Sequence, residues 1–168
     1  MKQTKNLALY GLLIALAFIF SYVESLFPVV FFVPGMKLGL ANLVIFAALY
    51  LLDFKAACVI SLVRMLLVAF TFSNTFSLLY SLGGGILSLL VMGALKKSGI
   101  FSGIGISVAG AAAHNIGQII VAAAVLGSAG VFGYLPVLLV TGCITGALIG
   151  LLGGMVVERI PKRLEGKL

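Results

Sequence analysis

The stretch from Ala56 to Phe72, AACVISLVRMLLVAFTF, is apolar almost throughout and carries one charged residue, Arg64, near its middle. Its length and composition predict a helix that crosses a lipid bilayer, since such helices need about 17–25 mostly apolar residues. A charge at the centre of such a helix costs at least about 2.5–3.5 kcal/mol on insertion scales, and it usually faces a bundle interior or a water-filled cavity. Arg64 therefore predicts a group of membrane helices with a polar interior.

Further apolar stretches lie on both sides of this one, separated by Pro, Gly, Asn, Ser and charged residues. We therefore expect an all-α integral membrane protein with six transmembrane helices in a single domain, residues 1–168. The second helix is short, and Gly39 can mark an irregular entry to it. The expected spans are about Leu7–Phe27, Leu38–Leu52, Ala56–Phe72, Phe76–Leu95, Gly103–Gly127 and Tyr134–Val157.

The composition indicates the same class of protein. The chain is 62% hydrophobic and 9% charged, with a mean hydropathy of +1.30, whereas soluble domains carry roughly 25% charged residues. A soluble chain of 168 residues could not bury so much apolar surface, so lipid must solvate much of it. The net charge of +7 is spread between apolar stretches and forms no basic soluble face, so we expect no nucleic-acid partner.

The distribution of Lys and Arg predicts the orientation, because cytoplasmic loops of membrane proteins carry an excess of these residues. If both termini are cytoplasmic, Lys37 is the one cation outside and Arg64 the one within the membrane. We therefore expect a multi-pass protein of the bacterial cell membrane with both ends in the cytoplasm. The other nine of the eleven cations then lie inside: Lys2, Lys5, Lys55, Lys96, Lys97, Arg159, Lys162, Arg163 and Lys167.

Acidic residues are too few and too scattered for most catalytic chemistry: Glu24, Asp53, Glu158 and Glu165. Magnesium-dependent phosphoryl or prenyl transfer needs clustered carboxylates, and one His with two separated Cys does not give a zinc site. The run Gly83–Gly85 lacks the Gly-Lys-Ser/Thr of a phosphate-binding loop. We expect no catalytic residues, no bound metal, no cofactor and no enzymatic activity of the chain alone.

Polar residues inside the apolar stretches are the candidates for ligand binding. His114 and Gln118 are four residues apart and share a helix face, with Asn115 at their flank. Amide and imidazole groups suit the recognition of carbonyl, hydroxyl or ring-nitrogen groups. The alternative is a hydrogen-bond network between helices that binds no ligand.

Arg64 is either an anchor for an anionic group of a ligand or one half of a structural ion pair, for which Glu24 is a candidate partner. Further candidates lie towards the outer side in the predicted orientation, where each can contact an entering ligand or serve as an interface residue or helix cap. They are Glu24, Lys37, Asn42, Asn74 and Tyr80.

The predicted outer segment from Phe27 to Lys37 is apolar but is broken by Pro28 and Pro34, so it cannot be a regular helix. It is either a lid over the outer mouth of the bundle or a surface loop that dips into the lipid headgroups.

Small residues recur on two helix faces and suit close helix contacts. Gly142, Gly146 and Gly150 are four residues apart, and packing within the chain is a simpler explanation for them than dimerisation. In the first span, Gly11 and Ala15 form a second small-residue face, for which spacing alone favours packing within the bundle.

Two motifs carry a resemblance to a known family: Pro34–Asn42, PGMKLGLAN, and Ala113–Gln118, AHNIGQ. They resemble signature stretches of the bacterial "Gx transporter" family, which is often catalogued as heptaprenyl diphosphate synthase component I. In its layout that family resembles the substrate-binding S components of energy-coupling factor (ECF) transporters. The resemblance covers essentially the whole chain.

The resemblance implies a subunit that captures a small vitamin-like molecule from outside, beneath the loop that joins the first two helices. It also implies a transmembrane coupling subunit and two cytoplasmic ATPases as partners, with Ala8, Gly11 and Ala15 as the docking face for the coupling subunit. Prenyl diphosphate synthases bind Mg²⁺ through Asp-rich motifs, and this sequence has none.

Three functions remain open at this point. The first is the small-molecule-binding subunit of an ECF-like importer, with a vitamin-like, isoprenoid or quinone-related ligand. The second is a non-catalytic membrane partner in an isoprenoid or quinone pathway or an electron-transfer system. The third, a self-contained channel or secondary transporter, has little support because one His and isolated acids make a poor proton relay.

Overall fold

The computed structural model describes residues 2–26 and 38–160, with side chains placed for 7–26 and 38–160. Within these ranges the chain is helical and contains no strand, so the all-α prediction is confirmed. The helices are α1 (Lys2–Leu26), α2 (Leu40–Leu51), α3 (Phe54–Thr71), α4 (Thr75–Ser98), α5 (Gly103–Leu126) and α6 (Leu135–Arg159), and a 3-10 helix, η2 (Ala129–Tyr134), precedes α6.

Among the described residues, five helical segments are long and apolar enough to cross a membrane: α1, α3, α4, α5, and η2 together with α6. Helix α2 forms where the second span was predicted, but it has only 12 residues. At 1.5 Å per residue it covers about 18 Å, whereas the hydrocarbon core is roughly 30 Å thick. Gly39 enters α2 with a left-handed φ of 79°, and seven of the 12 helix residues are buried. It is therefore a short interior helix.

Local polar groups and glycines set the ends of the long helices. Asp53, Asn74 and Ser102 precede α3, α4 and α5, and each side chain accepts a hydrogen bond from a backbone N–H in the first turn. Such caps replace the backbone partners that the first turn lacks. Gly99 and Gly127 follow α4 and α5 with φ of 70° and 61°, a conformation that glycine adopts readily. The chain can therefore reverse direction within a few residues.

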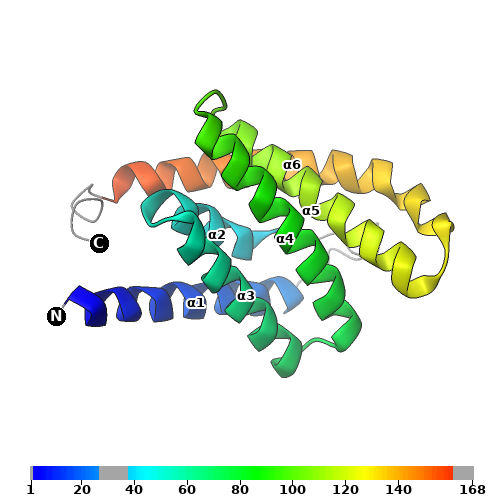
Figure 1. Cartoon of the computed structure of the whole chain (residues 1–168), viewed down its shortest axis with the longest axis horizontal. Coiled ribbons are helices and arrows are strands. Elements are labelled where there is room, and N and C mark those ends of the chain that lie inside the picture. Colours follow the sequence, from blue (N-terminus) through cyan, green and yellow to red (C-terminus); the bar gives the residue numbers. More distant parts are fainter. Residues whose placement is uncertain (1, 27–37, 161–168) are drawn as a thin grey trace.

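The helices form a closed ring. Contacts run from α1 to α2, α6, α5, α4 and α3, and from α3 back to α1. Figure 1 shows that the start of α1, the end of α6 and the turn before α3 lie towards the left end of the molecule. The end of α4 lies next to the turn before α3, because Lys96 donates a hydrogen bond to the carbonyl oxygen of Leu49. Lys55, Lys96, Lys97 and Arg159 belong to these segments. We call this the lysine end, and the predicted orientation places it at the cytoplasm.

The ring is solid towards the lysine end. A cluster of buried apolar side chains from α2, α3, α4 and α5 fills it there, and every member has an exposed fraction of 7% or less. The cluster uses the last turns of α2, the first two turns of α3, the later half of α4 and the first turn of α5. Its members are Ile45, Ala48, Leu49, Ala57, Ile60, Leu89, Met92 and Ile106.

Glycines allow α5 to approach both of its neighbours closely. A Cβ atom added to Gly117 would lie 2.5 Å from the carbonyl oxygen of Gly83 in α4, which is too close for any side chain. On the other side of α5, Cβ atoms at Gly146 and Gly150 of α6 would lie 2.9 Å and 2.8 Å from backbone Cα atoms of α5. The face of α6 formed by Gly142, Gly146 and Gly150 therefore packs against α5 within the chain. This agrees with the prediction that these glycines serve packing within the chain.

This close approach predicts a contrast between two Gly→Ala substitutions. Gly117→Ala should destabilise the fold, since overpacking typically costs about 1–3 kcal/mol. Gly154→Ala should be neutral or slightly stabilising, because nothing lies within 4 Å of its Cβ position and Ala favours a helix by about 1 kcal/mol over Gly. Thermal unfolding in detergent, followed by far-UV circular dichroism, measures both, and equal midpoints would contradict the close α4–α5 contact.

Candidate ligand-binding cavity

The ring surrounds a partly open cavity of about 80 Å³, to which each of the helices α1 to α6 contributes. A space of about 10–15 Å³ already admits one water molecule, so the cavity holds several waters or a compact polar group. Its polar lining residues are Glu24 from α1, Asn42 from α2, Arg64 from α3, Ser81 and Ser88 from α4, Ser107, His114, Asn115 and Gln118 from α5, and Thr141 and Thr145 from α6.

Six of the predicted binding residues line this one cavity: Glu24, Asn42, Arg64, His114, Asn115 and Gln118. Two others do not. The side chain of Asn74 caps α4 by accepting a hydrogen bond from the backbone of Ser77 at 2.8 Å, and Tyr80 is not among the lining residues. Lys37 lies outside the described residues. The structure brings the six together in space, and their role in binding stays a prediction.

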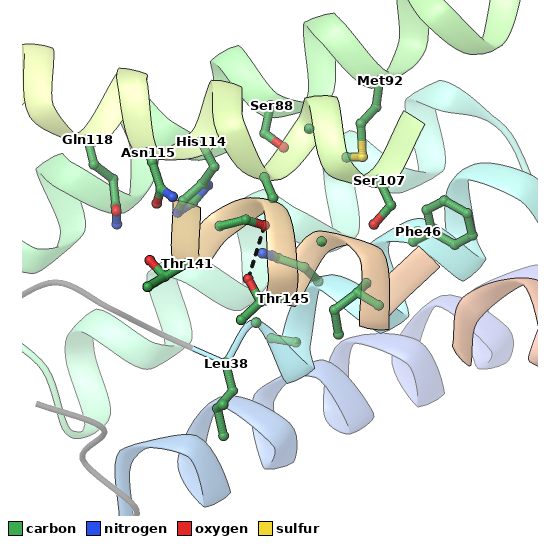
Figure 2. A pocket seen from close by; sticks show the side chains of 18 of the residues that line it. Leu38, Phe46, Ser88, Met92, Ser107, His114, Asn115, Gln118, Thr141 and Thr145 are labelled. Atoms are coloured by element: carbon green, nitrogen blue, oxygen red, sulfur yellow. Dashed lines mark hydrogen bonds between the residues drawn. The ribbon is translucent and has the colours of Figure 1, made fainter. Parts of the chain in front are cut away.

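The polar side chains of α5 differ in their contacts: one joins two helices, and the others face the cavity. The side-chain Nδ2 of Asn115 donates a hydrogen bond to the carbonyl oxygen of Leu138 at 2.5 Å, which ties α5 to α6. The imidazole of His114 lies against α4, since a Cβ atom at Gly84 would be 3.0 Å from its Cε1. The amide of Gln118 makes no hydrogen bond to any described residue and is available to a ligand. Figure 2 shows the three side chains at one end of the cavity.

Arg64 is held by few partners for a guanidinium inside a membrane bundle. Its Nη1 donates a hydrogen bond to the hydroxyl of Ser21 at 3.0 Å, and Ser21 is only 8% exposed. Its Nε is buried and has no hydrogen-bond partner in the described part of the chain. No carboxylate of the described residues lies within ion-pair distance of Arg64. The Arg64 side chain therefore retains donors that an anionic group in the cavity could satisfy.

Glu24, the predicted ion-pair partner of Arg64, has a different contact. Its Oε1 accepts a hydrogen bond from the backbone N–H of Gly39 at 2.5 Å, which joins the end of α1 to the entry of α2. A direct structural ion pair, one of the two alternatives for Arg64, is therefore absent from the described part of the chain.

The opposite end of the cavity carries hydroxyl groups that the sequence did not single out. Ser88 and Ser107 are 8% and 5% exposed and make no hydrogen bond to any described residue. Figure 2 shows Ser107 near Met92 and Phe46, away from Gln118. An isolated Ser in an apolar helix gives no distinct signal, because its hydroxyl commonly bonds the preceding turn of its own helix.

The predicted docking residues lie on the outside of the ring. Ala8, Gly11 and Ala15 are all exposed, and a Cβ atom at Gly11 would meet nothing within 4 Å. The alternative, in which this face packs within the bundle, is therefore wrong.

The chemistry of the cavity is suited to recognition. Within the described ranges Glu24 is the one carboxylate that lines it, and no three His, Cys, Asp or Glu side chains are grouped there to hold a metal ion. One guanidinium, three amides, an imidazole and five hydroxyls remain to bind a polar molecule through hydrogen bonds.

Comparison with known proteins gives one match. A family model described as heptaprenyl diphosphate synthase component I matches residues 13–156, a range that includes every residue of the cavity lining. No curated protein and no solved structure matches the chain.

The contacts of Arg64 predict how the ligand-free protein responds to its loss. Arg64→Met should leave the unfolding midpoint unchanged or raise it, because replacing poorly paired buried charge with an apolar side chain is often neutral or stabilising by about 1–4 kcal/mol. If Arg64 formed a buried structural ion pair, the same substitution would instead lower the free energy of unfolding by about 3–5 kcal/mol. Thermal unfolding by circular dichroism decides this. Glu24→Gln, which can still accept from Gly39, is the companion variant and should also unfold at the wild-type midpoint.

Proposed function

The chain belongs to the heptaprenyl diphosphate synthase component I family, and from this premise we propose that it is a small-molecule-binding membrane subunit similar to the S component of an ECF importer. Its ligand is a small vitamin-like, isoprenoid or quinone-related molecule. The observation that carries this proposal is Arg64, a poorly paired cation that lines a cavity to which every helix of the ring contributes.

The state of Arg64 favours a ligand with an anionic or strongly hydrogen-bond-accepting group. A charge taken out of water is costly unless a partner and further hydrogen bonds compensate it, and guanidinium binds carboxylate or phosphate through two parallel hydrogen bonds. The free amide of Gln118 and the imidazole of His114 line the same cavity and add donors or acceptors.

The size of the cavity narrows the ligand class. Pockets for drug-sized molecules measure about 300–1,000 Å³, whereas this cavity measures about 80 Å³. It therefore favours a compact polar molecule, or the polar head of an isoprenoid-like one, over a flavin-sized ring system.

The two ends of the ring differ in a way that suits uptake. The apolar cluster closes the lysine end, while Glu24, Leu38, Gly39 and Asn42 line the cavity where α1 ends and α2 begins. In the predicted orientation this second end faces outward. A ligand would then enter from outside, next to the segment proposed as a lid, whose residues 27–37 lie outside the described ranges.

The exposed face of α1 supports a partner in the membrane. Small residues let two helices approach closely in lipid, and Ala8, Gly11 and Ala15 present such a face away from the bundle. We propose that a transmembrane coupling subunit docks there, together with two cytoplasmic ATPases that supply the energy for uptake.

The family description supports a second candidate, a non-catalytic membrane subunit of a prenyl diphosphate synthase or of a related isoprenoid, quinone or electron-transfer system. The chain has no Asp-rich motif, so in this function a partner would supply catalysis. Co-purification from the native membrane separates the candidates, because the first predicts a coupling subunit with ATPases and the second predicts a prenyl synthase.

The binding proposal predicts that His114→Ala and Arg64→Ala each weaken ligand binding about tenfold or more, since the polar groups of the ligand would lose their partners. Native mass spectrometry of the detergent-purified protein identifies a retained small molecule, and titration with that molecule gives the affinities. Asn74→Ala is the control, because it removes a helix cap outside the cavity and should leave the affinity unchanged. Wild-type affinity in both cavity variants would contradict the assignment of this cavity as the ligand-binding site.

The docking proposal predicts that Gly11→Leu reduces recovery of the coupling subunit about tenfold, the effect of losing about 1.4 kcal/mol of binding. The fold should be unaffected, because nothing lies within 4 Å of the Cβ position of Gly11. Affinity purification followed by quantitative mass spectrometry measures the recovery. Val140→Phe on α6, where Val140 is 62% exposed, is the control for adding bulk to a lipid-facing surface, and equal recovery in the two variants would argue against this face.

A further inference from the structure

A second hollow lies outside the ring, at the lysine end. It has a volume of about 530 Å³ and is separate from the cavity described above, with which it shares no residue. Its lining is apolar apart from two lysines. The lining residues are Leu49, Phe54, Leu90, Gly93, Ala94, Lys96 and Lys97, and we call this hollow the lysine groove.

One face of α4 forms the length of the groove. Leu90, Gly93, Ala94 and Lys97 have the spacing i, i+3, i+4 and i+7, which places them on one side of a helix. Seven residues at 1.5 Å each give a strip of about 10 Å that runs from an apolar end to a charged end. Leu90 is 56% exposed, so the strip is open to the surroundings of the ring.

Small side chains make this strip hollow. Ala94 presents only a methyl group beside α4, and the side chain of Leu49, only 1% exposed, lies beneath it. The ring of Phe54 packs directly against Gly93, where its Cε2 would lie 2.6 Å from an added Cβ atom. The groove is thus a shaped apolar surface between α4 and the junction of α2 with α3.

The two lysines at its charged end have different roles. Lys96 donates a hydrogen bond to the carbonyl oxygen of Leu49, and its Nζ lies 4.9 Å from the centre of the Tyr50 ring, so Lys96 is fixed at the groove. Lys97 is exposed and makes no hydrogen bond or ion pair with any described residue. Both are in the last turn of α4, where they complement the helix dipole. That contribution does not require a hollow apolar surface beside them.

We propose that the lysine groove binds one anionic phospholipid from the membrane leaflet at the lysine end. An acyl chain lies along Leu90, Ala94 and the ring of Phe54, and the phosphate group sits at Lys97 beside the fixed charge of Lys96. Charge complementarity selects this occupant: the chain alone gains little on leaving other lipid tails, whereas each lysine near an anionic headgroup attracts it. This inference does not depend on the proposed function of the cavity.

The test uses the full-length protein in detergent, delipidated and titrated with phosphatidylglycerol or with phosphatidylcholine of the same acyl chains. Native mass spectrometry then measures the bound lipid. We expect phosphatidylglycerol to bind about fivefold or more tightly than phosphatidylcholine, and Lys97→Gln to remove most of this preference. Ala94→Phe, which fills the groove without a change of charge, should also lower phosphatidylglycerol binding.

Two matched variants control for charge and for bulk. Arg159→Gln removes a cation at the same end of the molecule, and Ile144→Phe adds an aromatic ring on the lipid-facing side of α6, where Ile144 is 58% exposed. Neither residue lines the groove, so both variants should bind as the wild type does. Circular dichroism confirms that all four variants are folded before lipid binding is compared.

Three results would overturn the proposal. The first is equal binding of the two phospholipids to the wild-type protein. The second is a loss of binding in the control variants as large as that in Lys97→Gln and Ala94→Phe. The third is displacement of bound phosphatidylglycerol by an equimolar amount of farnesyl diphosphate, which would assign the groove to a prenyl diphosphate instead.

Discussion

A guanidinium group in the middle of an apolar helix must be kept away from hydrocarbon, and the arrangement of this bundle follows from that requirement. Arg64 faces the interior, where the hydroxyl of Ser21 and the cavity provide polar surroundings. Six helices in a closed ring can provide such an interior only if they pack tightly at their seams. The glycines between α4, α5 and α6 allow this, because backbone meets backbone there. Lipid then contacts the outside of the ring and the polar side chains stay inside.

Much of the helical arrangement could be predicted from the sequence. The length of the apolar stretches, and the Pro, Gly and polar residues between them, largely determine where membrane helices begin and end. The helices, the breaks between them at Asp53 and Asn74, and the inward position of Arg64 all reflect local composition. The periodicity of α5 also correctly places His114 and Gln118 on a shared face. These features need no knowledge of which helix lies beside which.

Other features depend on the order of helices in the ring, which local patterns do not specify. The sequence could not show that Asn115 bonds to α6, nor that Glu24 accepts from Gly39. We predicted Asn74 and Tyr80 as candidate ligand contacts because they lie at the predicted outer side, but neither residue lines the cavity. Ser88 and Ser107 can be recognised as cavity residues only from the packing of the neighbouring helices around them.

The shortness of α2 has an electrostatic consequence. Its first turn begins within the bundle, and Leu38, Gly39, Ala41 and Asn42 line the cavity. No side chain caps this turn, although Glu24 takes the N–H of Gly39 just before it. A helix start carries a partial positive charge of about half an elementary unit, and low-dielectric surroundings strengthen its field. The carboxylate of Glu24 lies in this favourable field and offsets it. The attraction of an anion into the cavity therefore depends on the guanidinium of Arg64, and the start of α2 serves instead to hold Glu24 in place.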